Sequence, residues 1–142
     1  MKKLFILIPL VTLILSCSKD AHWNQKEYDR ILSSIKVPEF PSDTIDIVDL
    51  GARSDDANYL NDTIINNAIS ELSSRGGGVV KIPAGLYYTA GVILKDNVNL
   101  HLCEGCTLRF STRYEDYLPA VWTRWEGYDC YNYRPLIYGA SV

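Results

Sequence analysis

GGGVVKIPAGLYYTAGVILKDNVNLHLCEGCTLRF, residues 76–110, is the stretch that decides the fold. It holds short runs rich in apolar, β-branched and aromatic residues, at 79–82, 86–89, 92–94, 98–102 and 107–110. The bends between these runs are two to four residues long and contain glycine, proline, asparagine or aspartate. Strands this short, joined by such bends, are typical of a chain that turns repeatedly around one narrow core. The spacing alone predicts an all-β fold and leaves a sandwich or a small barrel open as alternatives.

A helix is predicted immediately before this stretch. Asn61 or Asp62 is a suitable N-cap, and the glycine run at 76–78 is a suitable C-terminal stop. The apolar residues recur on one face of this helix, and they are Ile64, Ile65, Ala68, Ile69 and Leu72. A helix with one apolar face, placed before a coiled β region, is suited to cap the open end of a repeat structure.

Two further elements are predicted nearer the N-terminus. Residues 21–36 carry apolar side chains at helical spacing and are followed by a proline-containing segment, so we expect a helix and a linker there. Residues 44–50 alternate between apolar and polar side chains and predict a short strand. The chain is therefore expected to divide into a signal segment at 1–17, a helix and linker at 18–42, and one β domain at 43–142.

The N-terminus has the features of an export signal. Lys2 and Lys3 precede an apolar run at 4–15, which is too short to span a membrane comfortably. The run ends in Ile-Leu-Ser-Cys, which resembles a bacterial lipobox, and this resemblance implies that Cys17 is acylated. We therefore expect an exported bacterial lipoprotein, membrane-anchored by its lipid alone, in the periplasm or at the cell surface. An ordinary cleaved signal with an incidental cysteine is the alternative.

Charge and composition narrow the function classes. The chain is 47% hydrophobic and 22% charged, which is typical of a globular protein. Its formal net charge is -3, and no basic patch stands out. Binding to nucleic acid is therefore not expected, because such proteins concentrate lysine and arginine on one surface.

Several segments taken together resemble a known family. They are DLGA at 49–52, the capped helix, GGGVVKIPAG at 76–85, NVNLHL at 97–102, TLRFS at 107–111 and TRWEG at 123–127. Together they resemble the N-terminal part of glycoside hydrolase family 28, the polygalacturonase family. The resemblance implies a right-handed parallel β-helix, a single-stranded solenoid of the pectin-lyase-like type. This chain would hold only its N-terminal coils and an α-helical cap, so the solenoid would be incomplete.

The same resemblance implies a function. Family members hydrolyse galacturonosidic bonds with inversion, so the expected partner is pectic polysaccharide or an oligogalacturonide, and no cofactor or metal is expected. If the chain is a truncation, the remainder of the β-helix is a further partner. A non-catalytic surface carbohydrate-binding or structural β-helix fragment and a pectate-lyase-type fragment are the alternatives.

The catalytic groups of the family are not found at matching positions. Family members carry an Asn-Thr-Asp segment, a later Asp-Asp pair, a Gly-His-Gly and an Arg-Ile-Lys. The adjacent Asp55 and Asp56 replace part of a Gly-Asp-Gly turn and are interpreted as solvated turn residues. No catalytic residue is therefore assigned, the chain is expected to be inactive alone, and its status as an enzyme stays open.

Aromatic residues crowd the segment after the coils. Eight rings fall there, at Tyr114, Tyr117, Trp122, Trp125, Tyr128, Tyr131, Tyr133 and Tyr138. Aromatic rings stack on sugar faces, and an arginine fork binds a uronate carboxylate. We expect most of these rings to pack a long loop against the coils, and we predict Arg124 and Trp125 as the residues that contact substrate.

Three cysteines leave their chemistry open. Cys103 and Cys106 form a lone C-x-x-C whose flanking residues are strand-like, which disfavours both a zinc site and a redox motif. We expect free or disulfide-bonded thiols and no metal. A bridge from Cys130 to either of the other two is compatible with the sequence, which does not fix the pairing.

Overall fold

The computed structural model describes residues 24–139. The chain divides into two compact units, the first ending at Pro38 and the second beginning at Glu39. The predicted export signal and Cys17 lie outside the described residues. Within residues 24–139 no helix combines the length and the apolar character needed to cross a membrane.

The first unit contains one described helix, α2 (Gln25–Ser34), inside the range that the sequence predicts. The Asn24 side chain accepts a hydrogen bond from the backbone N–H of Glu27 at 3.3 Å, which caps the first turn. Arg30 forms an ion pair with Glu27 one turn away, at 2.6 Å. No residue of the helix is buried. Its local stability therefore rests on the cap and on side-chain pairs along its surface.

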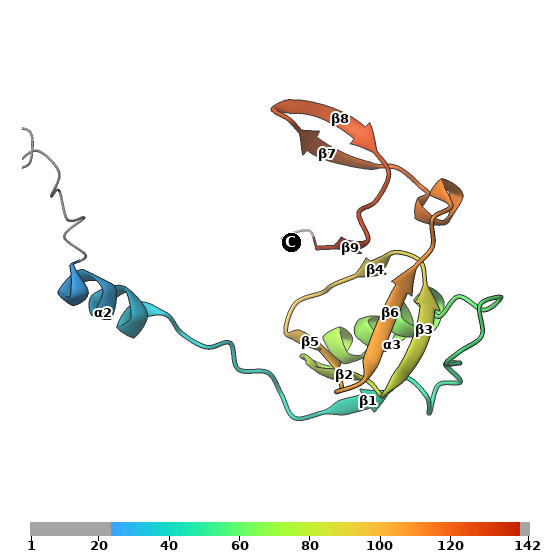
Figure 1. Ribbon diagram of the computed structural model, residues 1–142, viewed down its shortest axis with the longest axis horizontal. Coiled ribbons are helices and arrows are strands. Elements are labelled where there is room, and N and C mark those ends of the chain that lie inside the picture. The colour runs from blue at the N-terminus through green and yellow to red at the C-terminus, as the bar shows by residue number, and fades with distance from the viewer. Residues whose placement is uncertain (1–23, 140–142) are drawn as a thin grey trace, which may run out of the picture. The chain divides into compact units, whose positions relative to one another are not determined.

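The second unit is built from two turns of parallel strands (Figure 1). The first turn runs through β2 (Gly78–Ile82), β3 (Gly85–Thr89) and β4 (Val92–Ile93), and the second through β5 (Val98–Leu102), β6 (Cys106–Phe110) and β9 (Ile137–Tyr138). The pairs β2–β5, β3–β6 and β4–β9 are all parallel, so each strand lies beside its counterpart in the other turn. The strands predicted in residues 76–110 are thereby confirmed, with their ends shifted by one residue at most.

The first strand is shorter than predicted. β1 (Thr44–Asp46) pairs with β2 and stops at Asp46, although alternation predicts a strand as far as residue 50. The Asp46 carboxylate accepts a hydrogen bond from the N–H of Val48 at 3.0 Å, and the Asp46 carbonyl accepts one from the N–H of Asp49 at 3.1 Å. These bonds close a turn. An aspartate that bonds its own following backbone thus overrides the alternating pattern.

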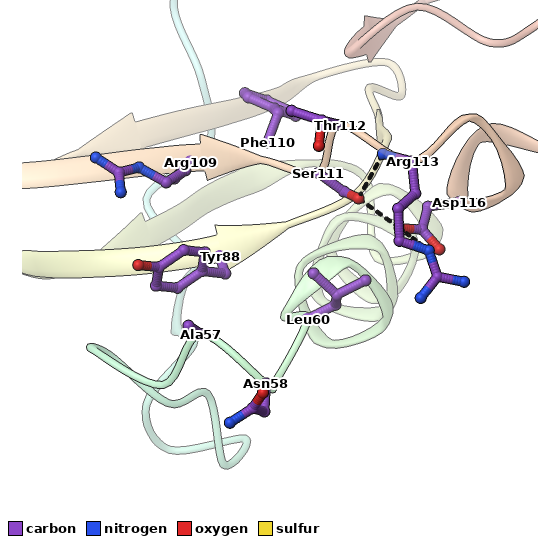
Figure 2. A pocket seen from close by; sticks show the side chains of 10 residues that line it. All are labelled: Ala57, Asn58, Leu60, Tyr88, Arg109, Phe110, Ser111, Thr112, Arg113 and Asp116. Carbon is purple, nitrogen blue, oxygen red and sulfur yellow. Dashed lines mark hydrogen bonds and ion pairs between the residues drawn. The ribbon is translucent and has the colours of Figure 1, made fainter.

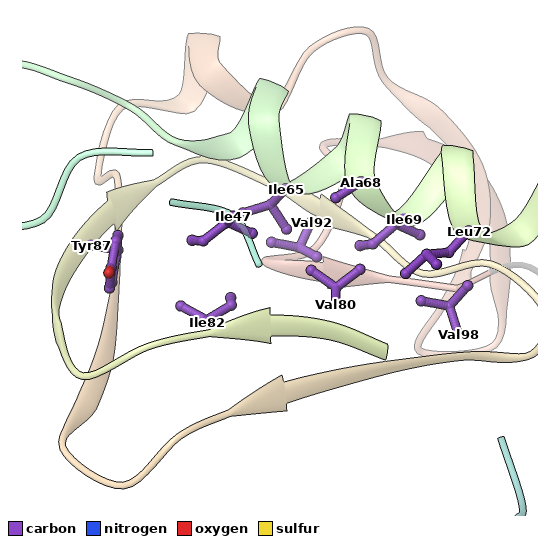
Figure 3. Packing of buried hydrophobic residues seen from close by; sticks show 10 residues of the cluster. All are labelled: Ile47, Ile65, Ala68, Ile69, Leu72, Val80, Ile82, Tyr87, Val92 and Val98. Carbon is purple, nitrogen blue, oxygen red and sulfur yellow. The ribbon is translucent and has the colours of Figure 1, made fainter. Parts of the chain in front are cut away.

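Helix α3 (Asp62–Ser74) supplies one side of the core (Figure 3). Four of the five residues in the predicted stripe are fully buried, and these are Ile65, Ala68, Ile69 and Leu72. They belong to one cluster with Ile47, Val80, Ile82, Val92 and other strand residues. Burial of each large apolar side chain contributes about 1.5–3 kcal/mol. The helix therefore covers the coil interior with its apolar face, as the sequence predicts.

Glycine is required after α3 for two reasons, to end the helix and to let neighbouring parts of the chain approach closely. The N–H of Gly77 donates to the Leu72 carbonyl at 2.8 Å, which closes the last turn of the helix. At Gly78 a Cβ atom would lie 2.4 Å from the Asp43 carbonyl oxygen and 2.7 Å from the Leu72 Cδ2 atom. Only glycine lets β2 begin this close to the segment before β1.

An insertion separates β6 from β9 in the second turn. It contains the 3-10 helix η1 (Tyr114–Tyr117) and an antiparallel hairpin of β7 (Val121–Trp125) and β8 (Tyr128–Asn132). The hairpin turn is Glu126-Gly127, and both residues have positive φ, 48° and 91°. Two-residue hairpin turns favour such angles because they match the strand twist. In the described chain β7 and β8 pack chiefly on each other (Figure 1).

Candidate functional site

A cleft of about 460 Å³ lies on the outer side of β3 and β6 (Figure 2). Its walls come from the loop before α3, from the two strands, and from the segment that follows β6. The residues that line it are Ala57, Asn58, Leu60, Tyr88, Arg109, Phe110, Ser111, Thr112, Arg113 and Asp116. This volume lies within the range of ordinary small-molecule sites.

Strand register brings Tyr88 and Arg109 together in the cleft. The two residues are direct partners in the parallel pair β3–β6. Tyr87 and Thr89 are buried, so Tyr88 between them faces outward, and Arg109 faces outward between two partly buried residues. The Arg109 guanidinium carbon lies 5.7 Å from the centroid of the Tyr88 ring. This distance is within the range of a cation–π contact.

The cleft carries more positive than negative charge. Its ionised side chains are Arg109, Arg113 and Asp116. Asp116 is held by a 2.5 Å hydrogen bond from the Ser111 hydroxyl, and its carboxylate lies 4.0 Å from the Nε atom of Arg113. In the described part of the chain, no carboxylate lies within ion-pair distance of Arg109. The guanidinium of Arg109 is therefore the uncompensated charge of the site.

The residues predicted to contact substrate, Arg124 and Trp125, lie on the hairpin and do not line this cleft. Both are exposed, and Trp125 keeps 61% of its surface accessible. They are consecutive in one strand, so their side chains point to opposite faces of the hairpin. Cross-strand register pairs Arg124 with Asp129 and Trp125 with Tyr128. The structure therefore does not bring the two predicted residues to one surface.

Arg124 shares its face with an aromatic pair. Trp122 and Tyr131 are cross-strand partners, and their ring centroids lie 5.0 Å apart at an interplanar angle of 69°. Trp122 is 60% exposed and Tyr131 is 72% exposed. This face of the hairpin therefore presents two rings and a guanidinium outward.

The prediction that most rings pack against the coils is wrong for this chain. Six of the eight rings are exposed, namely Tyr114, Trp122, Trp125, Tyr128, Tyr131 and Tyr133. Tyr117 is the buried one at 7%, and its hydroxyl donates to the Ser111 carbonyl at 2.6 Å. Burial raises the pKa of Tyr117. The rings on a two-stranded hairpin have no opposing layer here, which is why ring count alone misled the prediction.

A second hollow of about 430 Å³ lies beside Tyr117. It is lined by three tyrosines, Tyr114, Tyr117 and Tyr133, and by Thr112, Arg134, Pro135 and Leu136. An NH2 group of Arg134 donates to the Leu118 carbonyl at 2.5 Å. The guanidinium therefore serves as a tie between η1 and the segment before β9.

The carboxylates before α3 are turn residues, as predicted. Asp55 is exposed, and its N–H donates to the Leu86 carbonyl at 2.7 Å. Asp56 accepts from the N–H of Asn58 at 3.0 Å and lies 3.8 Å from an Arg53 nitrogen. Neither carboxyl group lines the cleft.

Asn61 is at the N-cap of α3, but its side chain does not cap the helix. The residue is fully buried. Its side-chain oxygen accepts from the N–H of Arg53 at 2.8 Å, and its side-chain nitrogen donates to the carbonyls of Arg53 and Tyr88, both at 3.0 Å. The predicted capping role is thus replaced by a tie between the loop and β3. An asparagine at the start of a helix is compatible with either role, so the sequence alone does not distinguish them.

The cysteines form no bridge in the described chain, where Cys103, Cys106 and Cys130 are free thiols. Burial and the neighbouring Cys103 raise the pKa of the Cys106 thiol. Residues 24–139 contain no group of three or more histidine, cysteine or acidic side chains arranged to hold a metal ion.

Tyr88 and Arg109 were not predicted from the sequence as site residues. A signal for them was present, because each lies at an outward position between inward-facing neighbours in a predicted strand. Their meeting depends on the register between two turns of the coil, which periodicity within one strand does not contain. Arg109 also stands apart from the aromatic segment on which the prediction concentrated.

The fold and the cleft place the second unit in the class of helix-capped coils of parallel strands, with a cleft on an outer face that carries two arginines and one aspartate. Among solved structures, the hyperthermoactive exopolygalacturonase from Thermotoga maritima is similar to this chain, at 37% identity and a TM-score of 0.72, over 81% of this chain and 25% of that one. The family 28 exopolygalacturonase from Yersinia enterocolitica is similar at 30% identity and a TM-score of 0.61, over 71% and 17% of the two chains.

These neighbours confirm the resemblance to glycoside hydrolase family 28, the polygalacturonase family. The chain spans about a quarter of the length of the Thermotoga enzyme and less of the Yersinia enzyme. No family model matches the chain, and no curated protein matches it either.

Proposed function

We propose that this chain is the N-terminal segment of a polygalacturonase-like glycoside hydrolase that acts on pectic polysaccharide. The observation that carries the proposal is the likeness to the Thermotoga exopolygalacturonase, in which 37% identity accompanies a TM-score of 0.72. The two turns of parallel strands would be the first coils of a right-handed parallel β-helix. Helix α3 would close its N-terminal end, because repeat structures need a cap over the first coil.

The proposed reaction needs groups that the described cleft does not contain. Inverting hydrolysis uses two carboxyl groups about 6.5–9.5 Å apart, one as general acid and one as general base for water. The cleft is lined by one carboxylate, Asp116, which Ser111 and Arg113 already engage. We therefore propose that the catalytic aspartates belong to later coils and that this chain is inactive alone.

The hairpin would contribute sugar contacts on both of its faces. Trp125 would stack on a sugar ring from one face, while Arg124 would approach a uronate carboxylate from the other. Exposure of the Trp125 ring supports this role, because exposed aromatic side chains gathered in one place often mark a binding surface. Trp125→Ala and Arg124→Gln are each expected to weaken retention on immobilised polygalacturonate, while Lys36→Gln in the first unit leaves it unchanged.

The test of inactivity is release of reducing ends from polygalacturonate by the purified chain. We expect none above a blank that lacks protein. Release above the blank would overturn the proposed inactivity, and formation of an unsaturated product would favour the pectate-lyase alternative. A cooperative melting transition of a monomeric chain that binds pectate without cleaving it would favour the non-catalytic carbohydrate-binding alternative.

The N-terminal anchor is a separate part of the proposal. Acylation of Cys17 would place the protein on a membrane surface as an exported lipoprotein, in the periplasm or at the cell surface. Growth with labelled palmitate should label the protein, and Cys17→Ser should abolish the label and move the protein to the soluble fraction. Equal labelling of the Cys17→Ser variant would contradict the anchor.

A further inference from the structure

We propose that the cleft on β3 and β6 is a sugar subsite that recognises a carboxylate, and that Arg109 is the residue that binds it. This inference rests on the proposed function, because it takes an acidic polysaccharide as the ligand. It adds a site on the coil itself, apart from the hairpin residues Arg124 and Trp125. It also assigns one side chain the role of distinguishing acidic from neutral sugar units.

Arg109 presents an available guanidinium in a formed cleft. Four arginines in the described chain lie within 4.0 Å of a carboxylate, at 2.6–4.0 Å, and these are Arg30, Arg53, Arg75 and Arg113. Arg109 makes no such pair among residues 24–139. A guanidinium presents paired N–H donors that match a carboxylate in two parallel hydrogen bonds.

The Tyr88 ring helps to hold Arg109 in place. The Arg109 guanidinium carbon lies 5.7 Å from the Tyr88 ring, which is the neighbouring side chain on β3. Figure 2 shows the Tyr88 ring between the Arg109 strand and the loop that carries Ala57 and Asn58. A cation stacked on an aromatic ring loses less freedom when it binds an anion than an arginine that moves freely.

The remaining walls of the cleft are partly apolar and partly polar. Leu60 and Phe110 supply apolar surface, and Asn58 and Thr112 supply polar groups. The Asn58 amide and the Thr112 hydroxyl make no side-chain hydrogen bond within the described residues. A hexuronate unit has an apolar ring face, several hydroxyl groups and one carboxylate. The cleft offers a partner for each of these three parts.

Arg113 is less suited than Arg109 to bind a ligand carboxylate. Its Nε atom lies 4.0 Å from both Glu115 and Asp116, and its backbone N–H donates to Ser111 at 3.1 Å. A ligand carboxylate near Arg113 would meet the negative charge of Asp116. Arg109, at the opposite end of the same wall in Figure 2, has no such competitor.

The test measures, by calorimetry without turnover, binding of a short oligogalacturonate and of its fully methyl-esterified form, in which a neutral ester replaces each carboxylate. A short oligoglucuronate and its methyl ester are measured in parallel. We expect the unaltered chain to prefer the acid. Arg109→Gln should weaken binding of the acid about 10-fold to 100-fold and leave the ester nearly unchanged, since a hydrogen bond to a charged group is lost. The control Lys95→Gln makes the same change in net charge at an exposed site outside the cleft and should leave the preference intact.

The outcomes separate this inference from the proposed function. If the unaltered chain prefers the acid and Arg109→Gln keeps that preference, the role of Arg109 is overturned and the proposed function stands. If Arg109→Gln removes a preference for oligoglucuronate while galacturonate does not bind, the carboxylate site is supported and the pectic substrate is not. Absence of any preference in the unaltered chain overturns the inference. An equal loss of affinity for the acid and the ester in Arg109→Gln, with unchanged circular dichroism, would also overturn the inference. Such a loss would indicate a merely structural role for Arg109.

Discussion

The coil and the hairpin of the second unit use apolar side chains in opposite ways. In the coil, Val80, Ile82 and Val92 are fully buried beneath α3, and the aromatic Tyr87 is buried with them. In the hairpin, Trp122 and Trp125 each keep about three fifths of their surface exposed, at 60% and 61%. The buried residues of the first coil turn pack against α3 and one another, whereas the hairpin strands pack chiefly on each other.

The difference shows that residue type alone does not decide burial. The coil combines alternation with a helix whose apolar face matches the coil interior, so inward positions find partners. A two-stranded hairpin has two faces and no layer of its own to cover either, and such hairpins are marginally stable in isolation. The coil is therefore expected to carry the stability of the unit, and the hairpin to carry exposed surface for recognition.

The largest loss of stability is expected from a substitution that adds a methyl group at the first residue of β2. Gly78→Ala should cost more than about 4 kcal/mol or prevent folding, because the new Cβ would lie 2.4 Å from the Asp43 carbonyl oxygen. The matched change in the hairpin is Gly127→Ala, where φ is 91° and nothing lies within 4 Å of the new atom. That variant should lose only about 1–2 kcal/mol from backbone strain. Urea denaturation of both variants checks the comparison, and equal losses would contradict it.

A smaller loss of stability is expected when an oxygen atom replaces the side-chain nitrogen of Asn61. Asn61→Asp replaces a nitrogen that donates to the carbonyls of Arg53 and Tyr88, so a buried carboxylate would face two carbonyl oxygens. We expect a loss of about 3 kcal/mol in unfolding free energy at neutral pH. The control is Asn67→Asp on the exposed side of α3, where a change below about 0.5 kcal/mol is expected. A comparable loss at both positions would show that Asn61 is not the tie between the loop and β3.

The same two regions explain how far the sequence predicts the fold. The strands of residues 76–110 and the stripe of α3 were predicted because period-two and helical spacing are local properties. β1 was predicted too long because the alternation continues through Ile47 after the Asp46 carboxylate has closed a turn. Asn61 was assigned to a cap, since a cap and a buried tie use the same residue type.

The candidate site was less predictable for a physical reason. Tyr88 and Arg109 are 21 positions apart, and only the register between two coils places them side by side. Arg124 and Trp125 were paired by adjacency in the sequence, although adjacency in a strand places side chains on opposite faces. A cleft formed across turns of a coil depends on pitch and register, and these follow from packing of the whole unit.

In the hairpin, removal of a large ring should cost much less than an equivalent loss from the core. Trp122→Ala removes the edge contact with Tyr131 at 5.0 Å from a residue that is 60% exposed. We expect a loss of about 0.5–1.5 kcal/mol, against about 2–5 kcal/mol for truncation of a buried isoleucine such as Ile69. Trp122→Phe keeps a ring at the position and should recover most of the loss. A loss above about 3 kcal/mol for Trp122→Ala in thermal or urea unfolding would mean that the hairpin packs more tightly than it does here.

The smallest expected effect concerns an ion pair that the coil forms and the hairpin does not. Lys81 and Asp46 are register partners on β2 and β1, and their charged groups lie 3.1 Å apart. Arg124 and Asp129 are likewise partners in the hairpin, yet no ion pair joins them in the described structure. The hydrogen bond and charge of Asp46 raise the pKa of Lys81 above its ordinary value. The stabilisation from this pair is therefore fully present below the pKa of lysine in the unfolded chain, and it is lost as pH rises through the higher pKa of the folded chain.

Titration of the Lys81 side chain by NMR checks this expectation. In Asp46→Asn the pKa of Lys81 should fall back towards its ordinary value, because both the hydrogen bond to a carboxylate and the nearby charge are removed. Asp49→Asn removes a carboxylate that acts on Lys81 only through its charge, so it should change the pKa far less. Equal shifts in the two variants would show that the charge of the surrounding turn, and not contact with Asp46, controls Lys81.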